Sequence, residues 1–198
     1  MSDFAKQILA SRKNLVTGRR AKFEKVAEEG GCGVVGFASS VPVGGRHIFE
    51  PSIQMHNRGN GKGGGIAAAC LTPEQLGVDA QMLRDDYILQ IALLDPDSRK
   101  AVEEDFITPS LEIDHKEKLT PVADYRDVGL DVRPPDILRY FVRAKDSELA
   151  SFAEGNALAD APPRLVEDEF IYHNSFKLNE NLYASLGEKR AFVLSHAR

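Results

Sequence analysis

Two glycine-rich blocks in the first third of the chain contain the residues whose types and spacing favour chemistry. One block reads Gly30-Gly31-Cys32-Gly33-Val34-Val35-Gly36-Phe37, and the other reads Met55-His56-Asn57-Arg58-Gly59, followed by NGKGGGIA. A free cysteine is most often a small buried apolar residue, and we expect that role for Cys70 in its apolar run IAAACL. The glycines around Cys32, together with the Arg58 block, favour a nucleophilic thiol at position 32 instead.

Both blocks contain the glycine spacing G-x-G-x-x-G, which also occurs in dinucleotide-binding loops. Such a loop follows a strand and opens a helix, whereas the first block follows a charged helical segment and the second precedes a predicted strand. The pair Gly61-Lys62 resembles part of a phosphate-binding loop, but residue 63 is Gly where that loop needs Ser or Thr. We therefore expect no nucleotide and no other cofactor.

The remaining histidines and carboxylates show no pattern typical of a metal site or a catalytic pair. The five histidines have no metal-ligand spacing with either cysteine, so we expect them to be surface or hydrogen-bonded structural residues. An acidic group in the middle of the chain is interpreted as a solvated face. It consists of Asp95, Asp97, Glu103, Glu104 and Asp105.

The order of these features resembles the class II glutamine amidotransferases, which are N-terminal nucleophile hydrolases. In that family a Cys-Gly-aliphatic-aliphatic-Gly strand is followed by a helix, then by His-Arg-Gly or Asn-Arg-Gly, and then by Gly-Ile. The long glycine-rich loop here is most similar to the amidotransferase domain of glutamate synthases and their stand-alone relatives. Residues 140–143, 179–187 and 191–196 also resemble segments of that domain, so the resemblance covers residues 32–198.

The resemblance implies that Cys32 is the catalytic residue and that L-glutamine is the substrate. In the family the cysteine is the first residue of the mature chain, and its own α-amino group accepts the thiol proton. An α-amino group titrates near ~7.7–8.0, which suits a general base at working pH. The thiolate attacks the glutamine side-chain amide and releases ammonia for a partner synthase domain or subunit. Arg58 is a candidate substrate-binding residue, with loop anchoring as the alternative role.

This role requires a free amino group on Cys32, and none of the three methionines, Met1, Met55 and Met82, directly precedes it. We therefore predict cleavage between Gly31 and Cys32, with residues 1–31 as a leader and residues 32–198 as a partial amidotransferase domain. The charge distribution agrees with this boundary. Residues 1–31 contain seven basic and four acidic side chains, whereas the rest of the chain carries a net charge of −8.

The resemblance also predicts that the glutamine pocket is incomplete and the domain C-terminally truncated. The family has a glutamine-holding Arg and an oxyanion-stabilising Asn-Gly pair in segments expected beyond residue 198, and the Asn60-Gly61 pair is not equivalent. Losing one oxyanion donor typically costs about 10²–10³ in rate. Two alternatives therefore stay open: a non-catalytic fragment that binds a partner synthase, or an N-terminal nucleophile hydrolase acting on another amide.

Composition places the chain among ordinary globular domains. It has 198 residues, is 42% hydrophobic and carries a net charge of −5, without the excess of Lys and Arg that a nucleic-acid surface requires. No apolar run approaches the ~20 residues of a membrane span, and the N-terminus lacks the apolar region of a secretory signal. With two cysteines and no disulfide framework, we expect a cytoplasmic protein.

Hydrophobic patterning predicts a fold of the α+β class. The predicted strands are residues 32–39, 66–71, 87–94, 137–142, 170–173 and 191–195. The predicted helices are residues 3–28, 46–57, 97–105, 145–154 and 179–186, with a further helix start at Thr72-Pro73. Residues 108–135 are predicted to be irregular. The resemblance implies the αββα four-layer sandwich of N-terminal nucleophile hydrolases, present in part.

Overall fold

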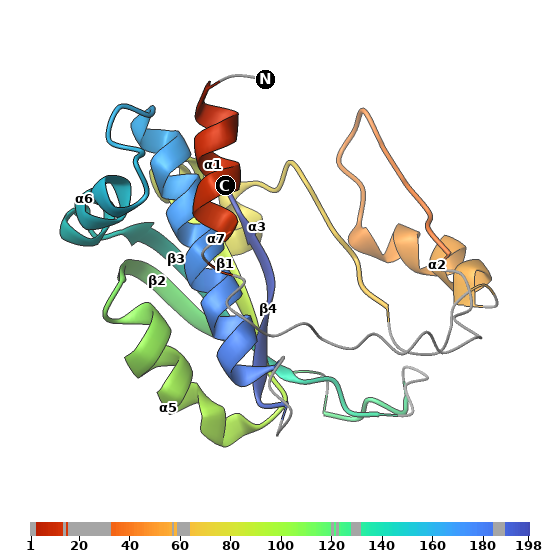
Figure 1. The fold of residues 1–198 in the computed structure, drawn as a ribbon. Helices are drawn as coiled ribbons and strands as arrows, with labels where there is room; N and C mark the ends of the chain where they lie inside the picture. The colour runs from red at the N-terminus through yellow and green to blue at the C-terminus, as the bar shows by residue number, and fades with distance from the viewer. Residues whose placement is uncertain are drawn as a thin grey trace. The chain divides into compact units, whose positions relative to one another are not determined.

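A computed structural model describes residues 3–13, 15, 33–56, 58, 64–119, 121, 123–127, 132–183 and 189–198. The chain divides into two compact units, which are treated separately below. The larger unit contains Met1–Arg19 together with Leu71–Arg198, and the smaller unit contains Arg20–Cys70 (Figure 1). The boundary predicted at residue 31 lies outside the described residues.

A four-stranded antiparallel sheet forms the centre of the larger unit. Its strands are β1 (Tyr87–Leu93), β2 (Leu111–Leu119), β3 (Asp136–Ala144) and β4 (Ala191–Ala197), in the order β2-β3-β1-β4. The strands predicted at residues 87–94, 137–142 and 191–195 are confirmed. The interior strands β1 and β3 are rich in Ile, Leu, Val and aromatic residues, which fit a pleated and buried surface.

The long helix α7 (Pro163–Leu182) covers one face of this sheet (Figure 1). Successive side chains on a strand point to opposite faces, so alternate residues of β1 and β3 form one apolar surface. Its fully buried members include Leu89, Ile91 and Tyr140, which pack with Ile171 and Leu178 of α7. Removing this apolar area from water is the main force that joins helix and sheet.

A row of polar side chains crosses the opposite face of the sheet. The Arg139 Nη1 atom donates to Glu117 Oε1 at 2.8 Å, and Arg139 Nε donates to Gln90 Oε1 at 3.2 Å. Gln90 Nε2 then donates to Ser195 Oγ at 3.1 Å. The four residues are direct cross-strand partners, so the row fixes the register of all four strands by side-chain contacts as well as by the backbone ladder.

Short helices precede the first strand of the larger unit and connect the strands that follow. They are α1 (Asp3–Lys13), α3 (Pro73–Leu76), α4 (Ala80–Asp85), the 3₁₀ helix η2 (Pro96–Ser98), α5 (Arg99–Val102), the π-helix η3 (Glu103–Ile107) and α6 (Asp146–Gly155). The helix start predicted at Thr72-Pro73 is confirmed, because Thr72 and Gln75 form a reciprocal capping box. Helix α1 forms the first part of the helix predicted over residues 3–28; residues 14 and 16–28 lie outside the described residues.

Two predictions for the larger unit are wrong. The segment predicted as a strand at residues 170–173 lies inside α7, because a short apolar run fits a buried helix as well as a strand. Residues 108–135 were predicted to be irregular, but they contain β2. That strand lies at the sheet edge and exposes a run of charged side chains, so it has no continuous apolar signal.

The smaller unit contains one helical segment among its described residues, the 3₁₀ helix η1 (Gly45–Ile48) continued by α2 (Phe49–His56). This confirms the helix predicted at residues 46–57. The buried strands predicted at residues 32–39 and 66–71 are wrong for the described residues 33–39 and 66–71, which are irregular. Val34, Phe37 and Ile66 are 87%, 54% and 56% exposed. Without strand partners in the described part of this unit, apolar runs form no ladder.

The class is therefore mixed α and β, with one four-stranded antiparallel sheet in the part of the chain that the structure describes. Within that part, none of the helices has the length and apolar character required to cross a lipid bilayer.

Candidate functional site

The predicted nucleophile and cleavage site, Cys32 and Gly31, lie outside the described residues. Arg58, the predicted substrate-binding residue, is exposed in the turn that follows α2. Its backbone N–H donates to the Met55 carbonyl oxygen at 3.0 Å, which closes the helix end. The structure thus gives the Arg58 backbone a loop-anchoring contact and leaves its side chain at the surface.

Gly33, the residue that follows Cys32, packs directly against Met55 at the end of α2. A Cβ atom at position 33 would lie 2.9 Å from Met55 Cβ and 3.0 Å from the Met55 carbonyl oxygen. Real Cβ atoms essentially never approach this closely, so only glycine fits without a shift of the neighbouring backbone. The Met55 carbonyl is also the acceptor for Arg58. Within the smaller unit, Gly33 and Met55, one residue of each glycine-rich block, therefore lie in contact.

Cys70 departs from its predicted core position. It is exposed and has a φ of 58°, the left-handed region that a non-glycine residue rarely adopts. The prediction rested on the run IAAACL forming a buried strand, which the structure does not contain. Because Cys70 is exposed, its thiol is accessible to thiol-directed reagents.

Of the histidine side chains that the structure describes, His47 is exposed and the other three have structural surroundings. His115 contacts the Phe141 ring edge-on, with ring centroids 5.8 Å apart. His173 is buried beside Glu169 on α7, and burial lowers the pKa of its imidazole. Burial also lowers the pKa of His196 on β4. Among the described residues, no group of three or more His, Cys, Asp or Glu side chains is placed to hold a metal ion.

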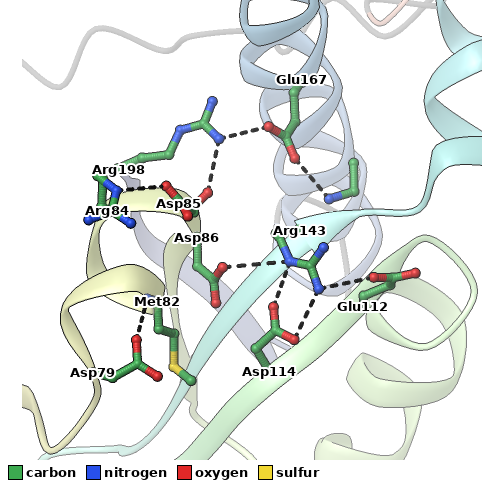
Figure 2. A network of polar contacts seen from close by, with 11 residues as sticks. Asp79, Met82, Arg84, Asp85, Asp86, Glu112, Asp114, Arg143, Glu167 and Arg198 are labelled. Carbon is green, nitrogen blue, oxygen red and sulfur yellow. Dashed lines mark hydrogen bonds and ion pairs between the residues drawn. The ribbon is translucent and has the colours of Figure 1, made fainter.

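Sequence reasoning missed a charged cluster at one edge of the larger unit, where Arg143 of β3 joins two aspartates (Figure 2). Its Nε donates to Asp114 Oδ2 at 2.7 Å and lies 3.7 Å from Asp86 Oδ1. Asp86 is 2% exposed, and burial, followed by repulsion from Asp114, raises its pKa to about 6. The same arginine holds the pKa of Asp114 below its ordinary value through a side-chain hydrogen bond.

This raised pKa predicts that Asp86 destabilises the fold at neutral pH. A carboxyl whose folded pKa exceeds its unfolded pKa contributes stability at low pH, and that contribution is lost as pH rises through about 6. We expect Asp86→Asn to raise the free energy of unfolding by about 1–2 kcal/mol at pH 8, or roughly 2–8 °C in Tm, and by little at pH 4.5. Thermal melts across this range test the prediction, and a pH-independent difference would contradict it.

A second ion-pair group lies beside the first and ties β4 to α7 (Figure 2). Arg198 Nη1 donates to Glu167 Oε2 at 2.8 Å and to the Asp85 carbonyl oxygen at 3.1 Å. Its guanidinium also lies 4.3 Å from the centre of the Tyr87 ring, a cation–π contact. Glu167 in turn accepts from the Ala144 backbone N–H. These contacts join three strands to α7 and account for the cluster as a structural feature.

A shallow cavity of about 320 Å³ lies between α7 and β4. Its lining combines aromatic, hydroxyl, amide and imidazole groups: Tyr172, Ser175, Phe176, Asn179, Ser195 and His196, with Val193 and Leu194. Asn179 Oδ1 already accepts from the Val193 backbone N–H at 2.7 Å, so this amide is engaged in holding β4. The cavity lacks a described thiol or carboxylate that would make it a reaction centre.

The described residues of the two glycine-rich blocks belong to the smaller unit, where Gly33 lies against Met55. The charged clusters of the larger unit are explained by fold stability. No protein-family model, no curated protein and no solved structure matches this chain.

Proposed function

We propose that the chain is a glutamine-hydrolysing amidotransferase domain with Cys32 as its nucleophile, supplying ammonia to a synthase domain or subunit. The observation that supports this most directly is the contact of Gly33 with Met55. The residue after Cys32 lies beside the residue whose carbonyl accepts from Arg58, and this supports one site built from the two blocks that resemble the amidotransferase motif.

The proposed reaction uses the Cys32 thiol and its own amino group. After cleavage of the Gly31–Cys32 bond, the free amine takes the thiol proton, and the thiolate attacks the side-chain amide carbon of glutamine. The C–N bond breaks, the amine-held proton passes to the leaving nitrogen, and ammonia departs from a glutamyl thioester. Water then hydrolyses the thioester to glutamate and regenerates the thiol.

Three further assignments belong to this proposal. Arg58 would bind the substrate through its exposed guanidinium or anchor the glycine loop through its backbone. The fold would be the αββα sandwich, with the four-stranded sheet and α7 as one sheet and one helical layer. The setting would be the reducing cytoplasm, which keeps a reactive thiol free.

A non-catalytic role is the second candidate, and exposed apolar side chains in the smaller unit favour it. Val34, Val41 and Ile53 are 87%, 62% and 66% exposed, together with Phe37 and Ile66. A contiguous patch formed by such side chains would be typical of a surface that another protein covers. In this case the chain would bind a synthase subunit without hydrolysing glutamine.

Intact mass measurement with 6-diazo-5-oxo-norleucine, a glutamine-like electrophile, separates these candidates. The background is Cys70→Ser, because the exposed Cys70 thiol is a competing target. We expect a species that begins at Cys32 and gains one adduct, located on Cys32 by peptide mapping. A processed chain that resists this electrophile but reacts with a general thiol reagent indicates a hydrolase of another amide. A full-length, unlabelled chain contradicts the enzymatic proposal and supports the binding role.

A further inference from the structure

Helix α1 lies beside α7 (Figure 1), and an ion pair between half-exposed Arg12 and buried Glu169 joins the two helices. Arg12 Nε donates to Glu169 Oε1 at 2.7 Å, and Arg12 Nη2 donates to Glu169 Oε2 at 2.8 Å. Glu169 is only 3% exposed. The pKa of Arg12 is raised, chiefly by this hydrogen-bonded pairing. Two nitrogen atoms of the guanidinium each donate to one oxygen of the carboxylate. Lys cannot form this paired geometry, so the contact is specific for Arg.

The groups around this ion pair are also shared between α1 and α7. The Ser11 hydroxyl is 3.4 Å from both Glu169 Oε1 and His173 Nε2, and His173 Nε2 is 3.3 Å from Glu169 Oε1. The Arg12 guanidinium lies 4.1 Å from the centre of the Tyr172 ring. Ser11, Glu169 and His173 are all buried, so α1 keeps a carboxylate and an imidazole away from water.

Apolar packing extends the contact toward the start of α1. Phe4 and Ile8 lie four positions apart, so they share one face of the helix. They pack against the buried cluster of Leu158, Ala161 and Val166. Helix α1 is therefore held both by apolar packing and by an ion pair. Apolar packing of this kind is how an amphipathic helix binds to another surface.

The ion pair of α1 reaches a distant part of the sequence. Arg12 and Glu169 are 157 positions apart, and the compact unit that includes α1 resumes only at Leu71. An 11-residue helix is marginal by itself in water, so α1 depends on this surface for its helical form.

We propose that α1 is a separable ligand of the surface formed by α6 and α7, so that residues 1–31 remain bound after the Gly31–Cys32 bond is cut. That processing step rests on the proposed function, but the docking contacts do not. The mature protein would then be a two-chain complex. Release of the leader would expose Glu169 and His173, and would free Tyr172, which also lines the cavity beside β4.

The test uses the full chain with a protease recognition sequence inserted between residues 31 and 32, in a Cys32→Ser background that prevents self-processing. After cleavage, gel filtration with mass detection shows whether the leader stays with the rest. We expect it to co-elute. Added protease makes this result independent of whether Cys32 is a nucleophile, so failure of the docking proposal and failure of the proposed function are distinguishable.

Competition in trans measures the role of Arg12 without changing the body of the protein. A labelled peptide of residues 1–31 is exchanged into the cleaved complex, and unlabelled variants compete. Arg12→Ala should compete about 100-fold less well, because it leaves the buried Glu169 carboxylate without its guanidinium partner. The Arg12→Lys peptide should compete less well than the native peptide and better than the Arg12→Ala peptide, because Lys keeps the charge but loses one of the two hydrogen bonds. The control Lys6→Ala, which removes an exposed residue paired with Asp3 on the same helix, should match the native peptide.

Two results overturn the proposal. One is immediate separation of the native leader from the cleaved protein. The other is a leader that stays bound but is displaced equally well by the native and Arg12→Ala peptides, since its retention would then not depend on the ion pair with Glu169.

Discussion

Replacing Cys32 with serine should lower glutamine hydrolysis by at least about a thousandfold, to the level of the uncatalysed background. Serine keeps the size and the adjacent amino group, but its hydroxyl is a far weaker nucleophile than a thiol near neutral pH. The amino group that suffices to deprotonate a thiol does not activate an alcohol to the same extent. Ammonia release from glutamine, followed with a coupled assay, gives the rate.

The control for this experiment is Cys70→Ser, which should keep nearly all activity. Cys70 is exposed and belongs to the irregular end of the smaller unit, so its loss removes a surface thiol only. Circular dichroism of both variants shows whether the fold is unchanged. A Cys32→Ser protein as active as the wild type would exclude covalent catalysis at this position, and activity lost in Cys70→Ser would move the nucleophile to Cys70.

The central strands were predictable because local sequence and tertiary surroundings agree. β1 and β3 are apolar runs bounded by polar or turn-forming residues, and both occupy interior positions of the sheet. The helix start at Thr72 was predictable for the same reason, since a capping box is satisfied within four residues. Elements of this kind need no information from distant parts of the chain.

Other elements depend on neighbours that the sequence does not identify. β2 exposes Glu112, Asp114 and Lys116, and only the sheet edge on β3 makes that segment a strand. Conversely, the apolar segments at residues 33–39 and 66–71 have suitable composition but no strand partner among the described residues. Composition indicates which segments can form strands, and pairing decides which of them do.

The candidate site also has features that the local sequence predicts and contacts that depend on distant residues. The two glycine-rich blocks are recognisable from their residue order, but the contact between Gly33 and Met55 could not be predicted from spacing alone. The Arg12–Glu169 pair spans 157 positions and the Arg143–Asp114 pair spans 29, so neither has a local pattern. In both cases single charged residues of ordinary appearance become buried or paired only when helices and strands pack.

Gly33→Ala should reduce glutamine hydrolysis about 100-fold while leaving the larger unit folded. The new methyl group would lie 2.9 Å from Met55 Cβ and 3.0 Å from the Met55 carbonyl oxygen, so the backbone beside Cys32 or the end of α2 must move. A displacement of about 1 Å at a nucleophile is enough to cost roughly 10² in rate, because attack requires near-ideal geometry. Steady-state ammonia release and intact mass give the rate and the extent of processing.

Gly36→Ala is the matched control, because a Cβ at position 36 meets nothing within 4 Å. Both substitutions add one methyl group to the same irregular segment and restrict its backbone to a similar degree. If only Gly33→Ala lowers the rate of glutamine hydrolysis, the cause is therefore its contact with Met55. Truncating Met55 to alanine should not restore activity, since its Cβ and carbonyl oxygen, the two nearest atoms, remain. Equal activity of the two glycine variants would show that Gly33 and Met55 need not meet for catalysis, and would remove the structural support for a site built from both blocks.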